Sequence, residues 1–319
     1  MKPLPLNVSD TPPEDWNTLC LTFGYIFYHP EWHTVLNVGF AARTVYVRQI
    51  KSKTYFSISI FKVGPFRIGY LGFPVGGALA GELNESLLLS LKNSGLTLDI
   101  LRVSVSAFSK PLELTANCFS SPETAVVDLE KWSLKFCPKL RRGLKKAHKN
   151  NVIFHDLMSD KYASELYEMY RLTVLTHGGQ VKYTREYFSA LLNLAQRSDR
   201  VRCIGGFFGN EMCGFVVAVL DAKTGYYLHG ATDKGGKGLG ISDLLIHEAI
   251  QWAQKEGMTG FNLMSSPVTQ PGLVRYKEKF GAVTRQHKTY ELTLSPLRAG
   301  VFKLALWMYY KIKGTFHLR

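Results

Sequence analysis

The sequence predicts an α+β protein in which one order of elements occurs twice, each time as a mixed, mostly antiparallel sheet flanked by helices. In the first half, three runs with strand character are followed by a helical segment at 82–95 and a further strand at 96–105. The second half repeats this order from Val201 onward. Identity between the halves is negligible, so the repetition indicates a duplicated unit with a boundary near residue 150.

Turn signals separate the strands in both halves. In the first half, KSK and VGP lie between TVYVRQI, TYFSISIF and FRIGYLGF. In the second, GN and DAKTG separate VRCIGGFF, EMCGFVVAVL and YYLHGAT, which predicts an antiparallel meander. A glycine-rich loop then opens a long amphipathic helix, a short strand follows, and a second helix carries several Lys and Arg residues.

The glycine-rich loop is the segment with the clearest chemical meaning. Four glycines between Gly235 and Gly240 leave backbone amides open at the start of a helix. Aligned peptide dipoles and unpaired N–H groups attract a phosphate or pyrophosphate there, although such a loop also serves as a simple tight turn. It is not a Walker loop, because no Ser or Thr follows the GK pair, and it lacks the βαβ setting of a dinucleotide site.

Composition limits the partners and the compartment. The 319 residues are 46% apolar and carry a net charge of +14, which indicates a nucleic acid, an anionic membrane or a phosphate-rich substrate as partner. The five cysteines show no metal-binding spacing, so we expect them reduced and mostly buried, and we expect no metal. Neither an apolar leader nor a membrane-spanning run is present, which predicts a cytoplasmic protein.

A basic segment lies between the halves. Residues 135–149 contain seven Lys and Arg residues and no acidic one. If the segment is helical after Pro138, its apolar positions form a narrow stripe of Leu140, Leu144 and Ala147. Like charges this close repel one another, which favours an anionic partner over the alternative of a solvated face.

Five motifs follow one another between roughly residues 25 and 285. They are FYHPEWHTVL, LRRGLKKAHKNNV, HGG with YTREYFSALL, ISDLLIHEAIQWAQKEGMTGFNL and VRYKEKFGA. In this order they resemble the FemAB-like acyltransferases, which are tandem-domain members of the GNAT superfamily. The family includes the peptidoglycan aminoacyltransferases and the BioF2-like acetyltransferases.

The resemblance implies two tandem GNAT-like domains and a reaction. The domains would be 1–150 and 151–292, with the donor-binding loop in the second, followed by a basic apolar helix at 293–319. The family transfers an acyl or aminoacyl group onto an amine, without a metal, in the groove between the domains. Its donor is acyl-CoA in typical GNAT proteins and aminoacyl-tRNA in the cell-wall branch.

The GGKGLG loop resembles the GNAT pyrophosphate loop in part. Gly238 and Gly240 fit its last two positions, whereas Gly235 stands where Arg or Gln is usual and Lys234 lies one place early. The resemblance therefore implies that Gly235, Lys237, Gly238 and Gly240 hold the donor.

Acyl transfer to an amine needs a base, a donor to the oxyanion and stabilisation of the leaving group. Lys277 is the first candidate for the last two roles, with an ordinary exposed lysine as the alternative, and its neighbour Tyr276 is a candidate proton donor. His229 and His177 are the candidate bases, although an isolated strand histidine is more often structural. Asp243 is expected to act as a dipole or capping residue at the start of the helix.

The acceptor site is expected to draw on the basic segment and on aromatic side chains. The resemblance implies that Arg141, Arg142 and Lys145 bind phosphates of the acceptor or donor near the groove. Trp32 and Tyr70 are candidates for lining the acceptor site, with aromatic core packing as the alternative. The acceptor would be an amine, and a phosphorylated or lipid-linked amine fits the charge.

The C-terminal segment VFKLALWMYYKIKG is apolar nearly all round and carries lysines. It is too short to span a bilayer, so it either docks on the protein or lies at a membrane interface, where it would suit a lipid-linked acceptor.

Three functions remain open from the sequence. An acyl-CoA-dependent N-acyltransferase is favoured by the glycine loop. An aminoacyl-tRNA-dependent transferase is favoured by the charge, but the chain lacks the long heptad insertion of some cell-wall members. A non-catalytic binder of nucleic acid, another anion or a membrane surface that has kept the fold is the third.

Overall fold

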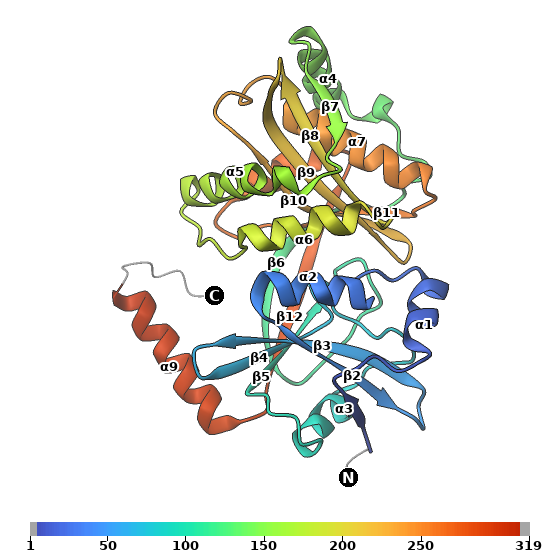
Figure 1. Ribbon diagram of the computed structural model, residues 1–319, viewed down its shortest axis with the longest axis vertical. Helices are drawn as coiled ribbons and strands as arrows, with labels where there is room; N and C mark the ends of the chain where they lie inside the picture. Colours follow the sequence, from blue (N-terminus) through green and yellow to red (C-terminus); the bar gives the residue numbers. More distant parts are fainter. Residues whose placement is uncertain (1–4, 313–319) are drawn as a thin grey trace.

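The computed structural model describes residues 5–312, and its strands form one continuous twisted sheet (Figure 1). Within these residues the sheet has 12 strands. Their spatial order is β1 (Asn7–Ser9), β2 (Arg43–Gln49), β3 (Thr54–Val63), β4 (Phe66–Leu71), β5 (Ile100–Val105), β12 (Val283–Thr293), β6 (Asn117–Val126), β11 (Gly260–Ser265), β10 (Thr224–Thr232), β9 (Glu211–Asp221), β8 (Val201–Phe208) and β7 (Ile153–Asp156).

The predicted duplication is confirmed by the strand pairing. Strands β2, β3 and β4 are antiparallel neighbours, and β5 lies parallel to β4 after the short helix α3 (Glu85–Leu89). Strands β8, β9 and β10 are likewise antiparallel, and β11 lies parallel to β10 after helix α7 (Ile241–Lys255). The fold is therefore the α+β architecture of two similar units.

The two units are joined by an exchange of strands. β6 follows β5 along the chain but pairs with β11 of the second unit. β12 follows the second unit but pairs with β5 of the first, and β6 and β12 pair with each other in the middle of the sheet. The exchange makes one continuous sheet of two units.

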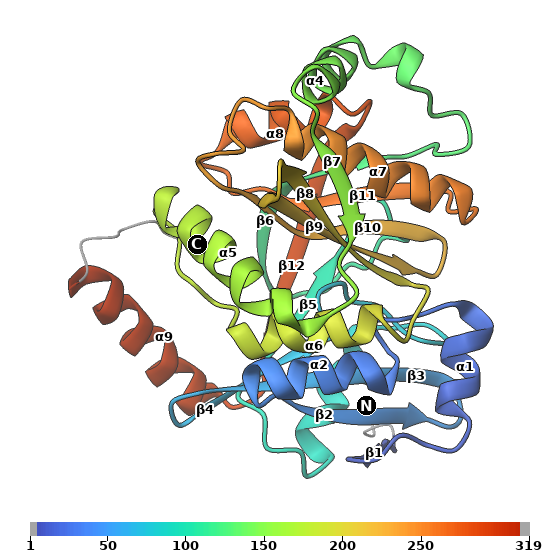
Figure 2. The same ribbon diagram turned by 45° about the horizontal axis from the view of Figure 1, so that its top comes forward.

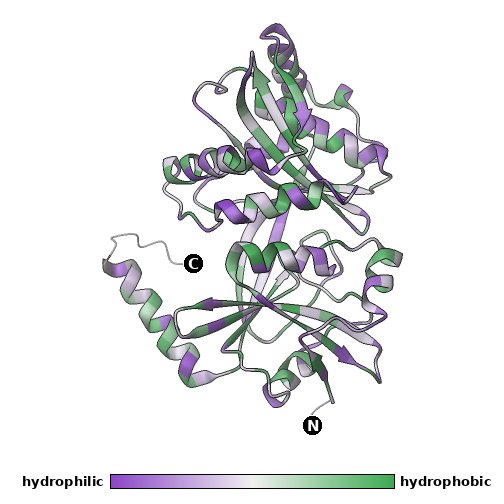
Figure 3. Ribbon diagram, viewed as in Figure 1, coloured by the Kyte–Doolittle hydropathy of each residue, from purple (hydrophilic) through white to green (hydrophobic). Residues whose placement is uncertain are grey.

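The helices cover both faces of the sheet (Figure 2). On one face, α1 (Trp16–Phe23) and α2 (Pro30–Phe40) of the first unit share a core with α5 (Ala163–Thr176) and α6 (Arg185–Ala195) of the second. On the other face, α7 and α4 (Pro138–Lys149) pack over the second unit. Alternate residues of β9 enter the two cores, which explains its continuous apolar run (Figure 3).

Helix α4 forms as the basic segment predicted, and its stripe of Leu140, Leu144 and Ala147 is buried. The stripe belongs to the core of the second unit, although the predicted boundary near residue 150 would assign it to the first. The limits 1–150 and 151–292 remain a proposal. α4 and β6 lie before residue 150 but contact the second unit, whereas β12 lies after it but pairs with β5 of the first unit.

Two further helices complete the chain. α8 (Pro271–Glu278) lies between β11 and β12, and α9 (Pro296–Ile312) follows β12, while the rest of the predicted 293–319 helix lies outside the described residues. Within residues 5–312, every helix is too short or too polar to cross a membrane. Four cysteines are buried and Cys118 is exposed.

Candidate functional site

The parallel pair β10 and β11 separates partway along its length. The two strands are in register only from Thr224 to Tyr226 and from Gly260 to Asn262. Beyond these residues β10 has an irregularity against β9, and β11 has one against β6. Such interruptions change the direction of side chains and are frequent beside active sites. The point where β10 and β11 separate is therefore a candidate position for catalytic groups.

Lys277 of α8 lies beside this point. Its side chain is only 5% exposed, and Nζ donates hydrogen bonds to the backbone oxygens of Met264 (2.9 Å) and Ser265 (3.1 Å) on β11. Burial lowers the pKa of the ammonium to about 8, against the opposing effect of the Glu123 carboxylate. The alternative of an ordinary exposed lysine is therefore excluded.

A chain of hydrogen bonds connects Glu123 on β6 to Lys277. Asn262 Nδ2 donates to Glu123 Oε1 (2.8 Å), and Asn262 Oδ1 accepts from the backbone N–H of Met264 (2.7 Å). Met264 has a φ of 64°, which is uncommon for a residue with a side chain. Its carbonyl then accepts from Lys277, so the polar contacts hold a strained residue in place.

The Glu123 carboxylate is well supplied with donors. Ser106 Oγ (3.1 Å) and the N–H of Ala107 (2.6 Å) donate to it, and His287 Nδ1 lies 3.6 Å from it. Burial alone would raise the pKa of Glu123, but the nearby imidazole of His287 and the hydrogen bonds from Asn262 and Ala107 outweigh that effect, so the pKa is lowered. The buried group is therefore an anion close to a buried lysine.

One more polar atom is available at this place. Among the described residues, Ser266 Oγ is buried and has no hydrogen-bond partner, while the backbone N–H of Ser266 donates to Pro122 O beside Glu123. Buried hydroxyls are normally paired, so this one has capacity for a bound group. Sequence reasoning missed Glu123, Asn262 and Ser266, because only the pairing of β6 with β11 brings them together.

The glycine loop lies at the start of α7 and is open on one side. Gly238 and Gly240 have φ values of 86° and 88°, a region that favours glycine. A Cβ on Gly240 would lie 2.6 Å from the oxygen of Gly143, so α4 covers that part of the loop. Gly238 is exposed, and Lys146 Nζ lies 3.8 Å from the position of a Cβ there.

Helix α8 links the loop to Lys277. Tyr276 Oη donates to Asp243 Oδ1 in the first turn of α7 (3.0 Å), and Lys279 forms an ion pair with the same carboxylate. Burial raises the pKa of Tyr276 well above its usual value, and Asp243 adds to this, so the phenol keeps its proton. Asp243 is thus an acidic residue in the first turn of α7, as the dipole alternative expects, and it also holds α8, whereas the N-cap of α7 is Gly240.

The two candidate histidines lie in different surroundings. His229 is buried, its Nε2 lies 2.9 Å from Tyr187 Oη, and its ring packs edge-on to Tyr183. Burial lowers its pKa to about 3. These contacts favour the structural alternative for His229. His177 is exposed at the carboxyl end of α5.

The residues expected to bind the acceptor also differ in their exposure to solvent. Trp32 is fully buried and donates to Phe73 O (2.6 Å), which favours the core alternative. Tyr70 is partly exposed and its Oη accepts from Arg102 Nη1 (2.9 Å). Arg141, Arg142 and Lys145 all face solvent on α4.

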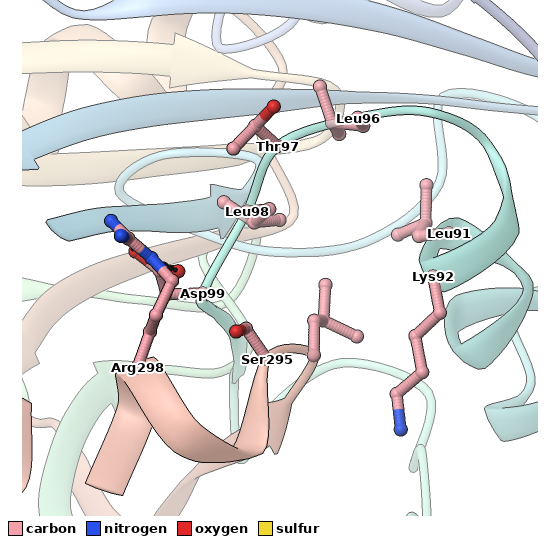
Figure 4. Close-up of a pocket in the computed structure, with 9 residues that line it drawn as sticks. Leu91, Lys92, Leu96, Thr97, Leu98, Asp99, Ser295 and Arg298 are labelled. Atoms are coloured by element: carbon pink, nitrogen blue, oxygen red, sulfur yellow. Dashed lines mark hydrogen bonds and ion pairs between the residues drawn. The ribbon is translucent and has the colours of Figure 1, made fainter. Parts of the chain in front are cut away.

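A shallow pocket of about 230 Å³ lies elsewhere, in the first unit beside the start of α9 (Figure 4). It is lined by residues 91–92, 96–99, 294–295 and 298, and the ion pair between Arg298 and Asp99 closes one side of it. None of the polar side chains around Lys277 contributes to this pocket. Within residues 5–312, no group of three or more His, Cys, Asp or Glu side chains is arranged to hold a metal ion.

Comparisons with known proteins give a family-model match and similar folds. Residues 135–278 match the family model of the acetyltransferase (GNAT) domain, a range that includes α4, the glycine loop and Lys277. The crystal structure of FemX is similar over 92% of this chain and 99% of that chain, with a TM-score of 0.65 and 10% identity. L-PGS from Bacillus licheniformis is similar over 88% of this chain and 92% of that chain, with a TM-score of 0.55 and 16% identity. No curated protein sequence matches the chain.

Residues 135–278 therefore carry an acetyltransferase (GNAT) domain, and this match supports an acyltransferase. More narrowly, the chain has the FemAB-like fold of two tandem GNAT units, as the motifs predicted.

Proposed function

We propose that the protein is an N-acyltransferase that moves an acyl group from acyl-CoA to an amine acceptor. The observation that carries the proposal is the position of Lys277, buried where β10 and β11 separate and connected through α8 to the glycine loop. A positive charge at the point of strand separation and open amides at the adjacent helix start are what a thioester with a pyrophosphate requires.

The glycine loop would bind the donor's phosphates. Gly235, Lys237 and Gly238 are exposed, and Lys146 of α4 stands beside Gly238. The amino end of α7 adds its dipole to these cations. Arg141, Arg142 and Lys145 lie on the same short helix as Lys146 and would extend the positive field toward the phosphates of the donor or acceptor.

Lys277 would act on the reacting atoms. The acceptor nitrogen attacks the thioester carbonyl, the C–N bond forms, the C–S bond breaks, and the proton lost by nitrogen ends on the thiol. Negative charge develops first on the carbonyl oxygen and then on sulfur. A buried ammonium stabilises both negative charges more strongly than an exposed one would. Tyr276 positions α8 through Asp243 in this scheme.

A ligand panel tests the donor. The melting temperature of the purified protein is measured with CoA, acetyl-CoA, uncharged tRNA and aminoacyl-tRNA, because a ligand that binds the folded state raises apparent stability. We expect CoA and acetyl-CoA to raise it. Silence of both CoA compounds would contradict the proposal, and silence of the whole panel would favour the non-catalytic alternative.

One observation favours aminoacyl-tRNA as a second candidate donor. Six of the 12 residues of α4 are exposed Lys or Arg residues and none is acidic, and a polyanionic backbone would neutralise several of these cations together. Under this alternative, aminoacyl-tRNA alone raises the melting temperature, and the effect falls steeply with salt. Changing Arg142 and Lys145 to Gln would weaken that response and make its dependence on salt less steep.

A further inference from the structure

Helix α9 is held on the first unit by one of its faces. Ala299 and Phe302 are buried against Ile68 and Ile100 of the sheet, and Leu306 packs beside them. Two ion pairs fix the helix: Arg298 to Asp99 (2.6 Å) and Lys303 to Glu291 (2.9 Å). Both ribbon views draw α9 at the outer margin of the molecule, next to β4 (Figures 1 and 2). These contacts define which face of α9 packs on the sheet and which face points away from it.

That opposite face is apolar and open to solvent. Leu297 (81% exposed), Val301 (52%), Leu304 (56%) and Met308 (46%) follow one another at intervals of four, three and four residues. This spacing places them on a single stripe, and Trp307 extends it. We call these five residues the α9 stripe. Exposed apolar stripes of this kind mark contact surfaces.

The charged residues in the sequence of α9 are all basic, and two of them, Arg298 and Lys303, are paired with Asp99 and Glu291 of the sheet. After Glu291 the sequence contains no acidic residue to its end, whereas it contains Arg298, Lys303, Lys311, Lys313 and Arg319. Lys311 Nζ lies over the Trp307 ring at 4.9 Å from its centroid. Lys62 and Val63 are exposed at the turn between β3 and β4, whose Pro65 oxygen accepts a hydrogen bond from Arg298.

We propose that the α9 stripe binds the surface of an anionic lipid bilayer, with the helix lying in the plane of the headgroups. Leucine, valine and methionine enter the acyl boundary in such a helix, tryptophan sits at the headgroup level, and lysines meet anionic lipids. The absence of acidic residues from this part of the sequence selects the lipid surface over a second copy of the chain, because a second copy would bring an equally cationic segment to the contact.

Vesicle flotation tests the proposal. The full chain is mixed with vesicles of phosphatidylcholine alone, or of phosphatidylcholine with phosphatidylglycerol, at low and high salt. The test variant carries Leu304→Ser and Met308→Ser, which leave the docked face of α9 unchanged. The control is Leu21→Ser, because Leu21 of α1 is 71% exposed and far from α9 in sequence.

We expect the wild type and the control to float with the phosphatidylglycerol vesicles, and the double variant to lose at least roughly tenfold in binding. High salt reduces the binding of all three. The emission of Trp307, identified by its loss in Trp307→Phe, moves to shorter wavelength with these vesicles only.

Two results would overturn the proposal. One is unchanged flotation of the double variant. The other is no flotation of the wild type together with a dimer in solution that the double variant disrupts, which would assign the α9 stripe to a second copy. The CoA response of the same variants is measured in parallel, so a failure here is distinguished from a failure of the proposed reaction.

Discussion

Lys277 of α8 donates a hydrogen bond of 2.9 Å to the backbone oxygen of Met264, the residue at which β11 takes a φ of 64°. The contact places an ammonium group against the strand that separates from β10. It also makes the charge of Lys277 depend on β6, because Asn262 connects Met264 to the Glu123 carboxylate.

Glu123→Gln should lower the pKa of Lys277 below about 8. The carboxylate raises that pKa against the effect of burial, so its removal leaves burial unopposed. The titration is followed by NMR of labelled lysine side chains, with Lys277→Arg identifying the signal. Glu113→Gln is the matched control, since Glu113 pairs with Lys288 and should leave Lys277 unchanged. An unchanged pKa in Glu123→Gln would rule out the electrostatic coupling.

Lys277→Met should make the free energy of unfolding rise less steeply with pH between about 8 and 10.5. The pKa of Lys277 is 10.5 in its ordinary state and about 8 in the fold, so between these values the unfolded chain binds a proton that the folded chain does not. Stability therefore rises with pH across this window, by about 3 kcal/mol for the full shift. Urea unfolding of both proteins at pH 7 and pH 10 measures the difference. Equal slopes in the two proteins would contradict the buried position of Lys277.

Gly143→Ala should destabilise the protein by about 2–4 kcal/mol. A Cβ at this position would overlap Asp243 Oδ2, so either α4 moves from α7 or Asp243 releases Tyr276 and Lys279. Gly300→Ala in α9 is the control, because its Cβ meets open space, and it should be neutral or stabilising by up to about 1 kcal/mol. Thermal and urea unfolding give both values. A neutral Gly143→Ala would show that the two helices are not packed this closely.

His229→Phe should protect the protein against mild acid. Burial lowers the pKa of His229 from 6.5 to about 3, so the unfolded chain gains a proton in this range and the folded chain does not. The free energy of unfolding of the wild type therefore falls as the pH decreases from 6.5 toward 3. The variant has no imidazole at this position, so this part of the fall is absent from it. The test is the urea midpoint of both proteins at pH 7 and pH 4. If acid weakens them equally, the imidazole is not enclosed by the aromatic core.

The repeated order of strands was predictable because each half has its own turn signals and its own runs of apolar residues. The exchange of β6 and β12 was not, since strand pairing across the middle of the sheet depends on contacts between distant segments. Lys277 could be chosen from its motif, but its burial could not be predicted. Glu123 was missed because its partner Asn262 lies 139 residues away. His229 was chosen for its chemistry, and only the packing of Tyr183 and Tyr187 reveals its surroundings.

Calorimetric titration of acetyl-CoA into the Gly238→Val variant tests the central claim most directly. Gly209→Val is the control, because both glycines have positive φ values and Gly209 faces open space in the turn after β8. We expect wild type and Gly209→Val to bind acetyl-CoA alike and Gly238→Val to lose at least about tenfold in affinity, or roughly 1.4 kcal/mol. Equal affinity of all three proteins would contradict a donor site at the glycine loop.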